Sequence, residues 1–90
     1  MFKVSIVIVN WNGKKYLKSC LESLQKITYK ATEVIVVDNN SSDGSQDLIK
    51  EKFRQVILIE EKSNHGFAGG NNIGYKVSTG EIIVLLNNDT

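Results

Sequence analysis

The chain has 90 residues, 41% hydrophobic and 23% charged, a composition typical of one globular domain rather than of a disordered segment. Lys and Arg number 11 against 10 for Asp and Glu, so no overall basic charge favours nucleic acid, and we expect membrane contact to be peripheral at most. The single cysteine, Cys20, cannot form an internal disulfide, and the apolar run Val4–Val9 is too short for a signal peptide or a bilayer-spanning helix. The sequence therefore predicts a cytoplasmic protein.

Four short apolar runs are the predicted strands: Val4–Val9, Val34–Val37, Val56–Ile59 and Ile82–Leu86. They are rich in β-branched residues and do not alternate apolar with polar positions. That pattern is typical of strands in a parallel sheet whose two faces are both covered by helices.

Between these runs, apolar residues recur with helical spacing over Lys14–Lys26, Ser45–Phe53 and Gly70–Ser78. Ser45 is the predicted N-cap of the second helix. The alternation of strand and helix predicts an α/β fold of three layers, in which helices cover both faces of a mostly parallel sheet. Residues 1–90 make one domain at most.

Amide, glycine and carboxylate residues follow each predicted strand, over residues 10–13, 38–44, 64–72 and 87–89. Open α/β sheets bind ligands beyond the carboxyl ends of their strands. One or two such residues suffice for a structural turn, whereas here they gather at every tip of the same edge. This coincidence predicts a ligand site.

Several common sites are excluded by what these segments lack. No G-x-G-x-x-G follows the first strand, and the chain contains no G-x-x-x-x-G-K-[ST] phosphate-binding loop. The sequence has no Cys/His cluster for zinc, and the lone His65 does not support a Ser-His-Asp arrangement.

Four motifs in order resemble family 2 glycosyltransferases. They read V-S-I-V-I-V-N-W-N at 4–12, V-V-D-N-N-S-S-D-G-S at 36–45, N-H-G-F-A-G-G-N-N-I-G at 64–74 and L-L-N-N-D-T at 85–90. The third is similar to the branch that contains rhamnosyltransferases of bacterial surface polysaccharides, and the fourth to the family's metal-binding element. The resemblance implies the Rossmann-like half of an A-type glycosyltransferase fold, with strand order 3-2-1-4.

The resemblance also implies roles for individual residues. Asp38 would accept a hydrogen bond from the donor's base or ribose, and Trp11 would stack on the base. Asp89 would be the carboxylate ligand of a divalent metal, Mg²⁺ or Mn²⁺, where the family motif has a second acid in place of Asn87. The residues expected to bind the nucleotide are Val9, Asn10, Trp11, Asp38, Asn40, Gly66, Gly69, Asn72 and Asn88.

The implied reaction is an inverting transfer of a sugar from a nucleoside-diphosphate sugar, with dTDP-rhamnose as one candidate donor. The acceptor would be a saccharide or a lipid-linked saccharide in surface polysaccharide synthesis. In this family the catalytic base follows the metal element, so we expect it beyond Thr90, assign no catalytic residue and expect the chain alone to be inactive.

Two alternatives stay open. The chain could be a nucleotide-binding module without transferase activity of its own. It could also be a sugar nucleotidyltransferase, although that class would need a Gly-rich, Lys/Arg-bearing loop where residues 10–13 stand. In the implied strand order the last strand has an unpaired edge, which predicts a homodimer formed through Ile82–Leu86.

Overall fold

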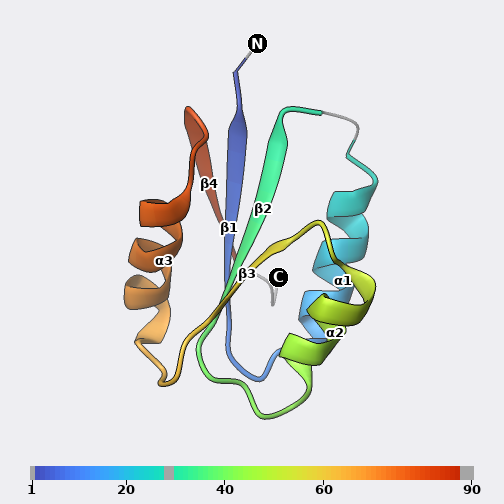
Figure 1. Ribbon diagram of the computed structural model, residues 1–90, viewed down its shortest axis with the longest axis vertical. Helices are drawn as coiled ribbons and strands as arrows, with labels where there is room; N and C mark the ends of the chain where they lie inside the picture. Colours follow the sequence, from blue (N-terminus) through green and yellow to red (C-terminus); the bar gives the residue numbers. More distant parts are fainter. Residues whose placement is uncertain (1, 28–29, 88–90) are drawn as a thin grey trace.

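The computed structural model describes residues 2–27 and 30–87, in which strands and helices alternate. The elements are β1 Val4–Asn10, α1 Lys14–Gln25, β2 Thr32–Asp38, α2 Ser45–Lys52, β3 Ile57–Glu60, α3 Gly66–Val77 and β4 Ile82–Asn87. The strands form one parallel sheet in the order β3-β2-β1-β4. Figure 1 shows α3 on one face of the sheet and α1 with α2 on the other. The three-layer α/β/α fold predicted from the sequence is confirmed.

The central strand β1 divides the core into two layers because successive side chains point to opposite faces of a sheet. Ile6 and Ile8 pack with Leu17, Leu21, Leu48, Ile49 and Phe53 beneath α1 and α2. Val7 packs on the other face with Ile35 and Val37, and Ile73 of α3 covers them. Burying a side chain of this size contributes about 1.5–3 kcal/mol, so this core supplies most of the driving force for folding.

The edge strands are less covered than the sequence predicted. Ile57 of β3 is 42% exposed, and Ile82, Val84 and Leu85 of β4 are 47%, 40% and 54% exposed. Helix α3 packs on β1 and β2, and α2 reaches β3, but the outer side chains of both edge strands stay exposed, so full burial on both faces is confined to the central strands. An apolar run alone does not tell a central strand from an edge strand.

Helix α3 begins at Gly66, four residues before the predicted start at Gly70. The Asn64 Oδ1 atom accepts a hydrogen bond from the Gly66 N–H at 2.8 Å, and Gly66 has a φ of 74°, a conformation that glycine adopts without strain. Gly66 and Gly69, which the sequence places before the predicted helix, are therefore helical residues. Gly70 marks close helix–sheet packing, because a Cβ at this position would lie 2.6 Å from Val9 Cγ1.

Glu33 fastens the α3–β4 connection to the amino end of the sheet. It accepts hydrogen bonds from the Ser5 hydroxyl and from Thr79 N at 2.8 Å, while the Gly80 N–H donates to Ser5 Oγ at 2.8 Å. Partial burial acts to raise the pKa of Glu33, but the bonds from Ser5 and Thr79 and the charge of Lys3 outweigh it and lower this pKa. This cluster fixes where β4 enters the sheet.

Asp43 joins the starts of two helices. Its Oδ2 atom accepts from Lys14 N of α1 at 2.9 Å, and its Oδ1 atom accepts from Ser45 N of α2 at 3.0 Å. Ser45, the predicted N-cap of α2, is instead its first residue, and Gly44 stands at the cap with a φ of 89°. The prediction for Ser45 was wrong because Asp43, which lies before the helix, accepts from both the backbone N–H and the hydroxyl of Ser45, so the Ser45 hydroxyl does not cap the first turn.

Replacing Asp43 with alanine is expected to lower the free energy of unfolding by about 2 kcal/mol, one cap for each helix. Partial burial acts to raise the pKa of Asp43, but hydrogen bonds from the Ser45 hydroxyl, Lys14 N and Ser45 N together hold it below its usual value. This stabilisation is therefore present at neutral pH and is lost as the pH falls through the folded-state pKa. Urea unfolding at neutral and acidic pH measures both effects.

The control is Asp47→Ala, which removes an exposed carboxylate from the first turn of α2. It should change stability far less, because no hydrogen bond to a helix start is lost. Equal losses for Asp43→Ala and Asp47→Ala would mean that the first-turn charge on α2, rather than the joint cap, sets stability here.

Candidate functional site

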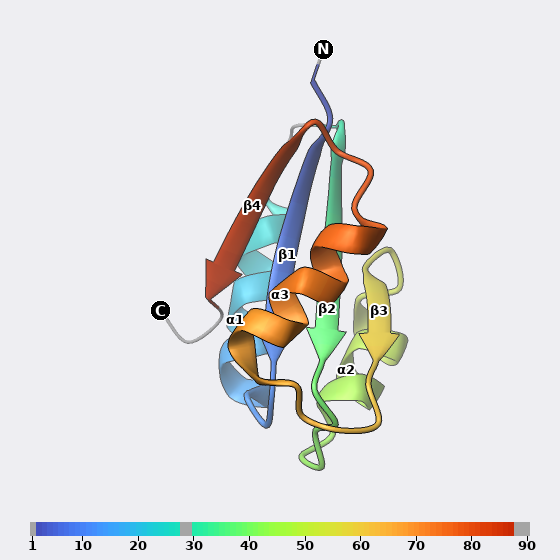
Figure 2. The same ribbon diagram turned by 90° about the vertical axis from the view of Figure 1, so that its left-hand side faces the viewer.

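The loops after β1, β2 and β3 meet at the carboxyl edge of the sheet, where the parallel strands end together (Figure 2). Hydrogen bonds tie them to one another. Asn12 N donates to Ser41 Oγ at 2.9 Å, and Ser42 N donates to Asn12 Oδ1 at 2.8 Å. The Asn39 side chain donates from Nδ2 to the Gly66 carbonyl at 3.1 Å, which links the β2 loop to the start of α3. The predicted convergence of these segments is confirmed.

Asp38 is the centre of this edge and is fully buried. Its Oδ1 atom accepts from Asn10 Nδ2 at 2.8 Å and from Ser41 Oγ at 2.7 Å. Its Oδ2 atom accepts from Ser41 N at 2.9 Å and from Gln46 Nε2 at 2.7 Å. Asn10 reaches Asp38 because the two residues are partners in the parallel register of β1 and β2. A buried carboxylate needs such donors, since an unpaired charge would be costly.

The other residues predicted to bind the nucleotide differ in exposure. Asn10 is fully buried beside Asp38, whereas Trp11 is 57% exposed at the rim. Asn40 is exposed and has a φ of 65°, so its turn presents the side chain to solvent. Of the rest, Gly66 and Asn72 are exposed, and Val9 and Gly69 are half-buried. The structure thus places a buried polar centre beneath an exposed rim.

Sequence reasoning missed four polar residues that shape this edge: Asn39, Ser41, Gln46 and Asn71. Asn39 is 1% exposed, and the side chains of Ser41 and Gln46 contact Asp38 directly. Asn71 is 9% exposed, and its buried Oδ1 atom has no hydrogen-bond partner in the described structure. An unsatisfied buried acceptor costs about 1–3 kcal/mol, which a ligand donor or a water molecule would recover. Ser41, three residues after Asp38, carried a local signal, since Asp side chains often bond backbone in turns.

A hollow of about 420 Å³ lies beside this edge, at the start of α1. Its lining includes three lysines and the exposed ring of Tyr16, and Asp43 closes one side. The chain as a whole carries a net charge of only +1, so this grouping gives the edge a local positive field. Its lining residues are Asn12, Gly13, Lys14, Lys15, Tyr16, Lys18 and Asp43.

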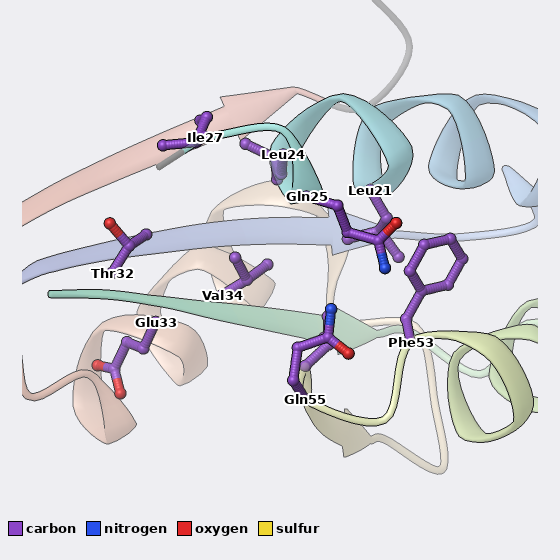
Figure 3. Close-up of a pocket in the computed structure, with 10 residues that line it drawn as sticks. Leu21, Leu24, Gln25, Ile27, Thr32, Glu33, Val34, Phe53 and Gln55 are labelled. Carbon is purple, nitrogen blue, oxygen red and sulfur yellow. The ribbon is translucent and has the colours of Figure 1, made fainter. Parts of the chain in front are cut away.

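A second hollow, of about 300 Å³, lies at the opposite end of the molecule between α1 and the starts of β2 and β3. Its walls are mainly apolar and include Leu21, Leu24, Val34 and Phe53. Figure 3 shows the carboxylate of Glu33 pointing away from these side chains. This second hollow lies at the amino end of the sheet, apart from the carboxyl edge.

Asn88 and Asp89, predicted to bind nucleotide and metal, lie outside the described residues. The register pairs Val9 with Asn87, so the chain after β4 starts from the same edge as the loop after β1. Within residues 2–27 and 30–87, no group of three or more His, Cys, Asp and Glu side chains could hold a metal ion. The metal site therefore stays a prediction that depends on Asp89.

Comparison with known proteins matches residues 5–90 to the family described as "Glycosyl transferase family 2". The chain is 36% identical over 87 residues to the UDP-Glc:alpha-D-GlcNAc-diphosphoundecaprenol beta-1,3-glucosyltransferase WfaP of Escherichia coli, covering 96% of the chain and 35% of that protein. It superposes on the mannosyltransferase PcManGT from Pyrobaculum calidifontis in complex with GDP-Man and Mn²⁺, with a TM-score of 0.89, 25% identity and coverage of 98% of the chain and 28% of the other.

A further solved structure, S. aureus TarS 1-349 in complex with UDP-GlcNAc, is 26% identical with a TM-score of 0.86. The match covers 97% of the chain and 26% of that structure. The chain spans only part of its curated relatives, 35% of the length of WfaP and 13% of that of the glycosyltransferase GlyA of Streptococcus pneumoniae.

Proposed function

The chain belongs to glycosyl transferase family 2, and from this we propose that its carboxyl edge binds the nucleoside diphosphate of a sugar donor. The observation that carries the proposal is the buried Asp38 carboxylate, around which the loops after β1 and β2 and the start of α2 are hydrogen-bonded. An Asp carboxylate is almost never fully buried unless it is paired, and here its partners come from the segments that form this edge. Two structural neighbours, with GDP-Man and with UDP-GlcNAc, support this reading.

Each part of the donor has a proposed place. Asp38 accepts a hydrogen bond from an N–H of the base, and the exposed ring of Trp11 stacks on the base plane. The diphosphate lies where the positive end of α3 and the lysines at the start of α1 favour negative charge. Asn40, Asn72 and Asn88 are proposed to contact the ribose and the diphosphate.

We assign a bound Mg²⁺ or Mn²⁺ to Asp89. One carboxylate together with phosphate oxygens is a donor set that Mg²⁺ accepts, so the residues available fit the ion. The ion would neutralise the charge that develops on the departing diphosphate. Asn87 stands where the family motif has a second acid and brings no charge, so affinity for the metal should depend on the nucleotide being bound as well.

For the protein as a whole, we propose transfer of the sugar with inversion to a saccharide or lipid-linked acceptor in surface polysaccharide synthesis. The E. coli relative, whose printed substrate is a diphosphoundecaprenol-linked sugar, supports this acceptor class. The family assignment leaves the sugar open, and dTDP-rhamnose is one donor to test beside UDP-glucose and GDP-mannose.

Calorimetry with UDP, dTDP, GDP and CDP, each with and without Mn²⁺, tests the proposal. Uracil, thymine and guanine each carry a ring N–H that can donate a hydrogen bond to a carboxylate, whereas the corresponding nitrogen of cytosine is itself an acceptor. We expect metal-dependent binding of one of the first three and none of CDP. Equal binding of UDP and CDP would remove Asp38 from base recognition, and no binding of any nucleotide would contradict the proposed function.

We propose that the protein is cytoplasmic and that any contact with a membrane is peripheral. Within the described residues, no helix combines the length and apolar character needed to cross a bilayer. Sedimentation with vesicles that contain anionic lipid would test the membrane contact directly.

We further propose that the chain self-associates through β4. This strand pairs with β1 on one side, and Ile82, Val84 and Leu85 are each at least 40% exposed. An apolar edge strand offers unpaired backbone groups to a second copy. Light scattering over a concentration series should show dimers, and Val84→Lys should return them to monomers. The matched change on the other edge, Ile57→Lys, should leave the dimer intact; dimers that survive Val84→Lys would place the interface elsewhere.

A further inference from the structure

All four acceptor positions of the Asp38 carboxylate are occupied by donors from the protein itself. Oδ1 accepts from Asn10 and from the Ser41 hydroxyl, and Oδ2 accepts from Ser41 N and Gln46 Nε2. A carboxylate has about four lone-pair sites. A ligand N–H can therefore reach Asp38 only if one of these donors leaves.

Three of the donors are held firmly. Asn10 is fully buried in β1, and its side chain also donates to Ser41 Oγ at 3.3 Å. The Ser41 hydroxyl in addition accepts from Asn12 N at 2.9 Å, so its removal would break several bonds. Ser41 N is part of the turn that follows β2, and the bond to Asp38 closes that turn.

Gln46 is held less firmly than the other three donors. Its side chain is half-buried and extends from the first turn of α2, on a flexible stem that can turn to solvent without moving backbone. Within the described residues, the bond of 2.7 Å to Asp38 Oδ2 is the one side-chain hydrogen bond of Gln46. Gln46 is therefore the donor that can leave at least cost.

We infer that, in the free protein, the side chain of Gln46 occupies the position at Asp38 that the nucleobase takes when the nucleotide binds. Its amide N–H occupies Asp38 Oδ2 until a ring N–H of the base displaces it, so Gln46 competes with the donor nucleotide for one acceptor. The inference rests on the proposed function, because it requires a base at Asp38. The side chain keeps the buried carboxylate satisfied when no nucleotide is bound, and it lowers affinity for every nucleotide that uses this position.

The test compares UDP binding to the wild-type chain and to Gln46→Met by calorimetry, in the presence of Mn²⁺. Methionine has a similar length and helix preference but no N–H, so the covering side chain stays and the competing donor goes. We expect UDP to bind about tenfold more tightly to Gln46→Met, since a hydrogen bond to a charged group no longer has to be broken. Gln55→Met, which changes an exposed glutamine outside the site, should leave affinity unchanged.

Nuclear magnetic resonance of the wild-type chain supplies a readout that needs no variant. The side-chain amide protons of Gln46 should move to the positions of a free glutamine when UDP and Mg²⁺ are added, while those of Gln55 stay in place. Equal or weaker binding by Gln46→Met, or Gln46 protons that do not move on saturation, would overturn the inference and leave the proposed function standing. Failure of both proteins to bind UDP, dTDP or GDP would contradict the proposed function, and the inference with it.

Discussion

Asp38→Asn is expected to lower the thermal unfolding midpoint by about 15 °C and to abolish nucleotide binding. The carboxylate accepts four hydrogen bonds within a fully buried site. Asparagine has the same shape but carries an NH₂ group in place of one carboxylate oxygen. In either orientation of the amide, this NH₂ group faces two of these donors. Leaving such groups unpaired costs about 3 kcal/mol, a large share of the stability of a domain this small.

Thermal unfolding followed by circular dichroism measures the first effect, and calorimetry well below the midpoint of the variant measures the second. Asp47→Asn is the matched control, because it makes the same chemical change on an exposed carboxylate of α2. A midpoint for Asp38→Asn within about 3 °C of wild type would mean that the buried network contributes little to folding.

Gly74→Ala is expected to destabilise the fold by about 2 kcal/mol, although alanine is the better helix former. A Cβ at this position would lie 2.3 Å from Val7 Cγ1 and 3.3 Å from Val7 Cγ2. Val7 is fully buried in the central strand, so neither partner can yield without shifting α3 from the sheet. Overpacking costs about 1–3 kcal/mol, and the contact is close enough to reach the upper value, against a gain of about 1 kcal/mol in helix preference.

A double-mutant cycle with Val7→Ala isolates the clash. Removing the two Cγ atoms of Val7 should make Gly74→Ala neutral or stabilising in that background, whereas it is damaging in the wild type. Urea unfolding of the four proteins gives the coupling energy. The same penalty in both backgrounds would show that the cost of Gly74→Ala arises outside the contact with Val7.

The sequence predicts the order of elements well because each strand is a dense run of β-branched residues. It fails at the start of α3, where a glycine-rich stretch looks like a loop. Gly70 and Gly74 are there because the helix approaches Val9 and Val7 too closely for a Cβ. That requirement comes from tertiary packing, and no local pattern expresses it.

The location of the candidate site follows from the sequence, since the polar residues at the strand tips must share an edge in a parallel sheet. The hydrogen bonds within it do not. The bond between Asn10 and Asp38 depends on the register of β1 with β2, and the bond from Gln46 depends on the angle at which α2 leaves the loop. Both are set by packing between elements far apart in the chain. Nothing local to Asp43 shows that its two oxygens accept from the first residues of two helices, because the starts of these helices are brought together by the fold.

Mapping of backbone amide shifts on addition of UDP, dTDP or GDP with Mg²⁺ tests the central claim most directly. The proposed function predicts shifts at residues 10–13, 38–42 and 66–72, with Thr32, Gln55 and Thr79 at the amino end unaffected. Replacing Mg²⁺ with Mn²⁺ should then broaden the same edge, because the paramagnetic ion would be held by Asp89. Shifts confined to the amino end, or no shifts with any of these nucleotides, would contradict a nucleotide site at the carboxyl edge.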